Sequence, residues 1–151
     1  MIMKYQSLTF VIVIFILFSC FQDDYKKARH EMVDEQIRSR GVIHPATLEA
    51  MQKVPRHEFV PESMRSYAYD DRPLSIGYNQ TISQPYIVAL MTASVDPDEK
   101  DKVLEVGTGS GYQAAVLAEI VDEVYTIEIV PELAQKAKRV FYELNYGNIN
   151  A

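Results

Sequence analysis

One stretch of the sequence combines a strand, a glycine-rich turn and an acidic residue one strand later. The apolar run Val103–Val106 is followed by Gly107, Gly109 and Gly111. Glycine adopts positive φ easily and lets the backbone pass close to a ligand. Glu128 follows a second strand-like run, and in an α/β sheet it would accept hydrogen bonds from two ribose hydroxyls. The pattern predicts a nucleoside-binding half-site in an α/β fold.

The spacing of the glycines limits the class of ligand that the turn is expected to bind. Dinucleotide-binding folds carry Gly-x-Gly-x-x-Gly, whereas this turn is Gly-x-Gly-x-Gly with the bulky Tyr112 next, which counts against a dehydrogenase. The run from Glu105 to Gly111 resembles the first motif of the S-adenosylmethionine-dependent methyltransferases. An ordinary tight turn in another α/β protein is the alternative. The resemblance implies that the cofactor is S-adenosylmethionine and that the turn holds its methionine end, through Gly107, Thr108, Gly109, Ser110 and Gly111.

The upstream segment is more specific. It contains Val-Pro-Arg-His-Glu-Phe-Val-Pro from Val54, Pro-Leu-Ser-Ile-Gly-Tyr from Pro73, and Gln-Thr-Ile-Ser-Gln-Pro-Tyr from Gln80. Together these segments resemble the protein-L-isoaspartate O-methyltransferase family. The resemblance implies methylation of the α-carboxyl of L-isoaspartyl residues in damaged proteins, the ester then collapsing to a succinimide. It also implies that Ser83 is the active-site serine and that Thr81 and Ile82 lie beside the cofactor.

The chemistry of such a site requires no strong base. A carboxylate with a pKa near 4 is already ionised at neutral pH, so catalysis consists mainly of aligning oxygen, methyl carbon and sulfur. The Ser83 hydroxyl could hold one carboxylate oxygen and leave the other free to attack. The local alternative is structural, because a serine before Gln84-Pro85 at a helix start can act as an N-cap.

The expected fold is α/β, the Rossmann-like fold of S-adenosylmethionine-dependent methyltransferases. We expect an N-terminal helical part and only the first two parallel strands of the sheet, near 103–106 and 124–127. Residues 55–78 read as an irregular connection with at most one short helix around 63–69. The chain stops where the family's third strand would begin, so we interpret it as a fragment or a truncated gene product and do not expect these 151 residues alone to be active. Apolar spacing and proline starts predict helices at 24–40, 45–54, 85–95, 112–121 and 131–146.

The N-terminus has a different character. An unbroken apolar run from Leu8 to Phe18 follows Lys4, which suits a signal-peptide core and falls short of the roughly 18 to 20 residues that span a bilayer. Ser19-Cys20 then resembles a bacterial lipoprotein processing site. We therefore predict a lipoprotein-type signal peptide at 1–19, lipidation at Cys20, and a location in the cell envelope or periplasm. An uncleaved, cytoplasmic protein is the alternative.

Composition limits the remaining classes. With 48% hydrophobic and 24% charged residues, 20–151 reads as the N-terminal portion of one methyltransferase domain, expected as a monomer. The net charge of −6 argues against nucleic acid as a partner and against electrostatic binding to anionic lipid. Any attachment to a membrane would therefore depend on the lipid anchor. A single cysteine allows no intrachain disulfide, and the three histidines share no ligand spacing, so we expect no metal site.

Two functional classes stay open. The leading hypothesis is an isoaspartyl methyltransferase that repairs proteins. The other is a truncated, non-catalytic lipoprotein or pseudo-enzyme that retains only part of the binding fold. Export also conflicts with a cofactor made in the cytoplasm, and the sequence shows no supply route.

Overall fold

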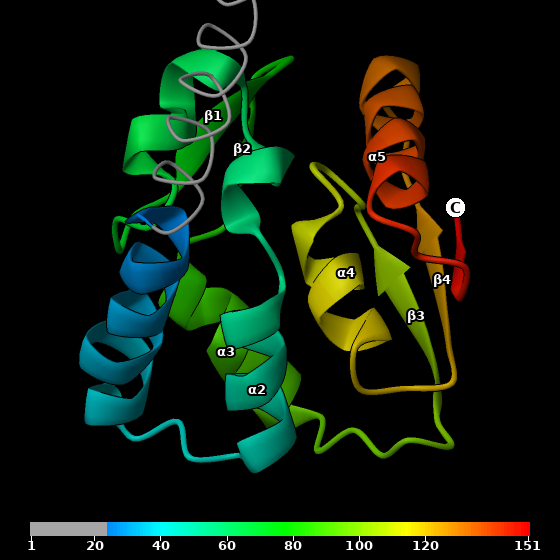
Figure 1. The fold of residues 1–151 in the computed structure, drawn as a ribbon. Helices are drawn as coiled ribbons and strands as arrows, with labels where there is room; N and C mark the ends of the chain where they lie inside the picture. Colours follow the sequence, from blue (N-terminus) through cyan, green and yellow to red (C-terminus); the bar gives the residue numbers. More distant parts are fainter. Residues whose placement is uncertain (1–23) are drawn as a thin grey trace, which may run out of the picture.

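The computed structural model describes residues 24–151 of the chain. The predicted signal peptide at 1–19 and the predicted lipidation site at Cys20 lie outside the described residues. The described part has three regions, which are an N-terminal helical part, an antiparallel pair of strands and a parallel sheet with its helices (Figure 1).

The N-terminal part begins with a helix that changes its winding along its length. Residues 24–31 are α-helical and lead into the π-helix η1 (Met32–Ile37) and the 3₁₀ helix η2 (Arg38–Arg40). Gly41 ends the helix in the left-handed conformation, with φ of 94°. The predicted helix at 24–40 is thus confirmed, and its change of winding is not encoded in the simple apolar spacing. The next helix, α2, spans Pro45–Lys53.

The segment predicted to be an irregular connection holds more structure than expected. It contains two 3₁₀ helices, η3 (Arg56–Phe59) and η4 (Glu62–Tyr67), and the strand β1 (Leu74–Gly77). This strand pairs antiparallel with β2 (Gln80–Ile82) through a turn in which Tyr78 and Asn79 both have positive φ. No glycine marks the turn centre, so the usual hairpin signal is missing. The strands are specified instead by tertiary packing, since Leu74, Ile76 and Ile82 are buried.

The parallel sheet has the order β3-β4-β5. The two predicted strands are present as β3 (Lys102–Val106) and β4 (Glu123–Ile127), paired residue by residue. A third strand, β5 (Ile149–Asn150), pairs parallel with Val124 and Tyr125, so the expectation of only two strands is corrected to three.

Three further helices lie close to their predicted positions. They are α3 (Pro85–Ser94), α4 (Tyr112–Ala118) and α5 (Pro131–Glu143). Helix α4 lies between the helices of the N-terminal part and the sheet (Figure 1), where it packs against β4 as well as α2 and α3. The predicted apolar face of α5 is confirmed, with Leu133, Ala137 and Phe141 buried.

The two faces of the sheet differ in exposure. Val124 and Thr126 point into the buried face. Leu104, Val106 and Ile127 lie on the opposite face and are 64%, 76% and 55% exposed. The packed core of the described chain therefore lies on one side of the sheet, and this side supports the site described below.

Substitution of Gly111 tests the packing of α4 against α5. A Cβ at this position would lie 2.6 Å from two ring carbons of Phe141, and its φ of 89° already disfavours an L side chain. Gly111→Ala should therefore lower the free energy of unfolding by about 2 kcal/mol or more, measured by urea denaturation. Gly147→Ala is the control, because nothing lies within 4 Å of the added Cβ and no positive φ opposes it. Equal stabilities of the two variants would contradict this packing argument.

Candidate functional site

The glycine-rich turn after β3 is folded back onto the end of β4. The backbone N–H groups of Gly107 and Thr108 both donate to the carbonyl of Ile127, at 2.8 and 3.2 Å. The three glycines have φ of 95°, 55° and 89° at 107, 109 and 111. The sharp turn inferred from the sequence is confirmed.

The three glycines do not share one role. At position 111 a glycine is needed because a side chain there would collide with the Phe141 ring of α5. The glycine at this position therefore allows α4 and α5 to pack together and does not make room for a ligand. Gly107 has open space where a Cβ would be, and Gly109 has ordinary contact distance to Ile76, at 3.6 Å. Only the turn at 107–109 therefore leaves room for an approaching ligand.

Glu128 lies at the end of β4, directly against this turn. Its Oε2 accepts a hydrogen bond from the Gly109 N–H at 2.7 Å, and its Oε1 accepts one from the Val130 N–H at 2.9 Å. Burial alone would raise the pKa of Glu128, but backbone N–H groups of Val130, Gly109 and Ile129 outweigh it and hold the pKa below its usual value. The carboxylate is therefore ionised at neutral pH, and each oxygen keeps a lone pair for a ligand hydroxyl.

A cavity of about 230 Å³ lies between the turn and the end of β2. Thr81, Ile82 and Ser83 line one side of it. The opposite side is formed by the end of β3 and the turn, residues 105–110. The structure thus brings seven of the predicted site residues together in one cavity, leaving out Gly111 and Glu128. The cavity is also lined by Val88, Met91, Tyr112 and Gln113, which were not predicted as site residues.

Ser83 sits between β2 and α3 and is not the N-cap of that helix. The N-cap position is Gln84, whose side chain makes no capping hydrogen bond. The capping interpretation of Ser83 is therefore wrong. The neighbouring groups are fixed instead, because the Ser83 carbonyl accepts from Arg56 Nη2 and the Gln84 amide donates to Asp71 Oδ2, both at 2.8 Å.

Glu105 lines the same cavity and was not predicted as a site residue. Its Oε2 accepts a hydrogen bond from the Thr126 hydroxyl. The same Thr126 Oγ1 atom lies 2.6 Å from Thr108 Oγ1. Burial raises the pKa of Glu105 to about 7, the Thr126 hydrogen bond opposes the rise, and the Glu128 charge adds to it. A glutamate on a half-buried strand, two residues before the first glycine, was the available sequence signal.

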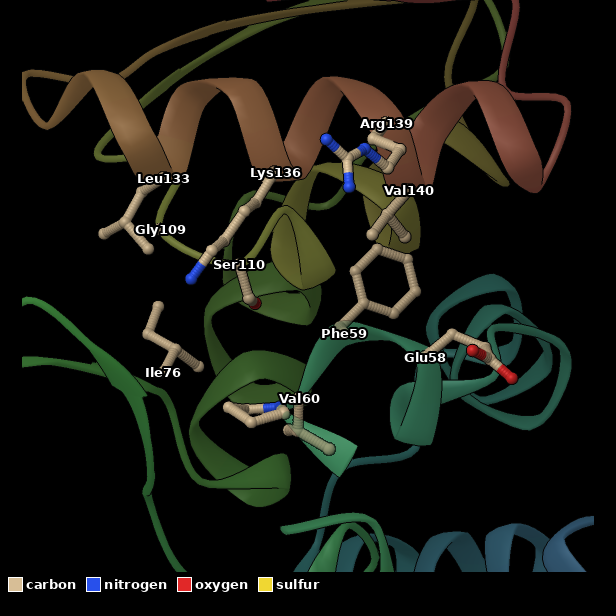
Figure 2. Close-up of a pocket in the computed structure, with 11 residues that line it drawn as sticks. Glu58, Phe59, Val60, Ile76, Gly109, Ser110, Leu133, Lys136, Arg139 and Val140 are labelled. Atoms are coloured by element: carbon tan, nitrogen blue, oxygen red, sulfur yellow. The ribbon is translucent and has the colours of Figure 1, made fainter. Parts of the chain in front are cut away.

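A second cavity, of about 240 Å³, lies on the other side of Gly109 and Ser110 (Figure 2). Its walls are mainly apolar, from η3, β1 and α5, and Figure 2 shows Lys136 reaching from α5 toward Ser110. It shares only Gly109 and Ser110 with the predicted site residues. The cavity at Ser83 is therefore the candidate functional site.

Among residues 24–151, no group of three or more His, Cys, Asp or Glu side chains is placed to hold a metal ion. Over the same residues, no helix has both the length and the apolar character needed to cross a membrane.

Comparison with solved structures agrees with this arrangement. A protein-L-isoaspartate O-methyltransferase superposes with a TM-score of 0.73 and 30% identity, over 80% of this chain and 40% of that protein. A Plasmodium falciparum protein, solved in complex with S-adenosyl-L-homocysteine, gives a TM-score of 0.68 at 22% identity, over 81% and 61% of the two chains, and supports the fold alone. The fold is that of the Rossmann-like S-adenosylmethionine-dependent methyltransferases.

Sequence comparison specifies the family. The sequence model of the Protein-L-isoaspartate(D-aspartate) O-methyltransferase (PCMT) family matches residues 27–151. The protein-L-isoaspartate O-methyltransferase of Syntrophus aciditrophicus is 55% identical over 127 residues, 84% of this chain and 58% of that protein. The corresponding protein of Gloeobacter violaceus is 61% identical over 118 residues, 78% of this chain and 58% of its own length. The chain belongs to the protein-L-isoaspartate O-methyltransferase family, and it spans less than two thirds of the length of these relatives.

Glu105 provides a pH-dependent test of the site. Its folded pKa of about 7 lies above the usual value of 4.5, so the native state binds the proton more tightly than the unfolded state. The stability from this group is full below about pH 4.5 and is lost as the pH rises through about 7. Glu105→Gln should therefore gain stability relative to wild type between pH 4.5 and 8, by on the order of 2 to 3 kcal/mol in urea denaturation.

Glu128→Gln is the matched control, with the opposite sign. Its folded pKa is lowered, so its contribution is present at neutral pH and is lost as the pH falls. The difference between wild type and Glu128→Gln should shrink toward acidic pH. The same pH trend in both variants would show that Glu105 is not buried as described.

Proposed function

We propose that the protein transfers a methyl group from S-adenosylmethionine to the α-carboxyl of L-isoaspartyl residues in damaged proteins. The observation that carries this proposal is the single cavity formed by Thr81, Ile82 and Ser83 on one side and the glycine-rich turn on the other. Membership of the protein-L-isoaspartate O-methyltransferase family supports it independently.

The residues present fit S-adenosylmethionine. The turn at 107–109 offers room for a ligand, and Glu128 offers ionised oxygens suited to ribose hydroxyls. Glu105, at the opposite end of the turn, offers a carboxylate to the positive charges of the methionine end. One relative in structure, from Plasmodium falciparum, is described in complex with the demethylated cofactor product. When bound, the cofactor supplies a methyl group activated by its sulfonium.

The acceptor side of the cavity fits a carboxylate. Ser83, which lines it, has a hydroxyl that can donate a hydrogen bond to one carboxylate oxygen. No general base is needed, because the accepting carboxylate is already ionised at neutral pH. The task of the protein is then to bind, orient and exclude water, which favours a fixed hydroxyl over a titrating side chain.

Ser83→Ala tests this assignment. Because Ser83 is not the N-cap, we expect the melting temperature to stay within about 1 °C of wild type, while methyl transfer to an isoaspartyl peptide falls at least tenfold. Affinity for S-adenosylhomocysteine, measured by calorimetry, should remain within twofold. Ser94→Ala, at the other end of α3, is the control and should leave both quantities unchanged.

A second variant separates the cofactor from the acceptor. Gly109→Val places a branched side chain at a turn position with φ of 55° and should abolish S-adenosylhomocysteine binding. Binding of NAD, or unchanged product affinity in Gly109→Val, would reject the methyltransferase assignment. Normal turnover of Ser83→Ala would reject the role of Ser83 alone.

The location of the protein is proposed from the sequence. The apolar run before Cys20 supports a lipoprotein signal at 1–19, a lipid anchor at Cys20, and a location in the cell envelope. Labelled palmitate should then be incorporated by wild type and not by Cys20→Ser, with the mature N-terminus at residue 20. An intact N-terminus at Met1 without label would support the cytoplasmic alternative, and it would remove the conflict with cofactor supply.

A further inference from the structure

Arg56 is a charged side chain placed inside the core beside the candidate site. It belongs to η3, yet its relative exposure is 0%. Its Nε donates to the Ala68 carbonyl and its Nη2 to the Ser83 carbonyl, each at 2.8 Å. The guanidinium carbon also lies 4.8 Å from the ring centroid of Tyr112. One side chain thus joins the end of η4, the segment after β2 and the start of α4.

Two of these three contacts are walls of the candidate cavity. Ser83 and Tyr112 both line it, from the segment after β2 and from α4 respectively. Gln84, the next residue, is held separately by its hydrogen bond to Asp71. The backbone at Ser83 and Gln84 is therefore held by side chains from other segments, and Arg56 is the one that bonds Ser83 directly.

The environment of Arg56 is costly for a cation. None of the ion pairs in the described part of the chain includes it, and its Nη1 atom has no hydrogen-bond partner there. Burial lowers the pKa of Arg56, although Tyr112, Tyr69 and the more distant Asp71 carboxylate oppose the shift, and an arginine still remains protonated. Burying a cation that has no carboxylate in an ion pair with it costs stability. Residues that lower stability in this way are expected at functional sites. Packing alone would be served as well by a long apolar side chain.

We propose that Arg56 is a positioning residue for methyl transfer, which fixes the Ser83 backbone so that the hydroxyl faces the carboxylate to be methylated. A charge-assisted hydrogen bond is about twice as strong as a neutral one, and a guanidinium carries its donors in a rigid fork that grips two carbonyls at once. A lysine can replace the charge but not this fork. The inference rests on the proposed function, because it gives Ser83 the acceptor role.

The first experiment requires no activity. In wild-type protein, arginine-selective NMR should show slow exchange of the Arg56 guanidinium hydrogens and a scalar coupling across the hydrogen bond to the Ser83 carbonyl carbon. Arg65 is the internal control, since it is half-exposed in its ion pair with Glu58 and should exchange quickly. Exchange of the Arg56 hydrogens as fast as those of Arg65 would overturn the proposal.

The second experiment compares Arg56→Lys with the control Arg65→Lys by amide hydrogen exchange. Arg56→Lys should speed exchange in residues 80–84 at least tenfold and leave β3 unchanged, whereas Arg65→Lys should alter neither. Unchanged exchange at 80–84, or equal acceleration throughout the core, would show that Arg56 only supports stability.

A double-mutant cycle then asks whether Arg56 acts through Ser83. Arg56→Lys should lower kcat at least tenfold in wild-type background and less than twofold in the Ser83→Ala background, with S-adenosylhomocysteine affinity within twofold throughout. Equal losses in both backgrounds would overturn the proposal. Absence of both methyl transfer and product binding in the full-length wild-type protein would instead reject the proposed function, and the two exchange experiments would still decide the role of Arg56.

Discussion

The site depends on one constraint, which is the attachment of the turn after β3 to the carboxyl end of β4. Two successive N–H groups, of Gly107 and Thr108, share the Ile127 carbonyl, and the next glycine donates to Glu128. These bonds are possible only because the backbone takes positive φ, and only because the two strands run parallel in register. The turn is therefore held in shape before any ligand arrives, and its open side is the side that a ligand can approach.

The second half of the site comes from the N-terminal part of the chain. Residues 81–83 reach the turn because the β1–β2 pair is packed by Leu74, Ile76 and Ile82, and because Arg56 holds the Ser83 carbonyl. Helix α4 joins the two halves, since it begins at the glycine-rich turn and carries Tyr112 beneath the Arg56 guanidinium. The helical part is thus the support for one wall of the cavity.

The sequence predicted those features that have local causes. Apolar runs, proline starts and glycine stops placed β3, β4 and the helices α3 to α5, and the motif placed Thr81 to Ser83 beside the turn. The β1–β2 pair was missed because Tyr78 and Asn79, and not glycines, occupy the two central positions of its turn at positive φ, and because its strands are short. Glu105 and Arg56 were missed for another reason. Their contacts are made with residues far away in the sequence, such as Thr126 and Ser83, so the position of Glu105 before the glycines was visible locally but its partners were not.

The pKa values of the two glutamates beside the turn are shifted in opposite directions, and this difference suits a ligand with two unlike parts. Glu128 receives backbone N–H donors that keep it ionised, so it is a permanent acceptor for neutral hydroxyls. Glu105 receives little beyond a threonine hydroxyl and remains near half-protonation at neutral pH. A cation beside Glu105 would lower the pKa of this carboxyl group, so that Glu105 would lose its proton and pair with the cation. S-adenosylmethionine carries its positive charges on the methionine part, and its ribose hydroxyls lie between the sulfonium and the adenine. The proposed function therefore accounts for a buried carboxylate that the free protein stabilises poorly.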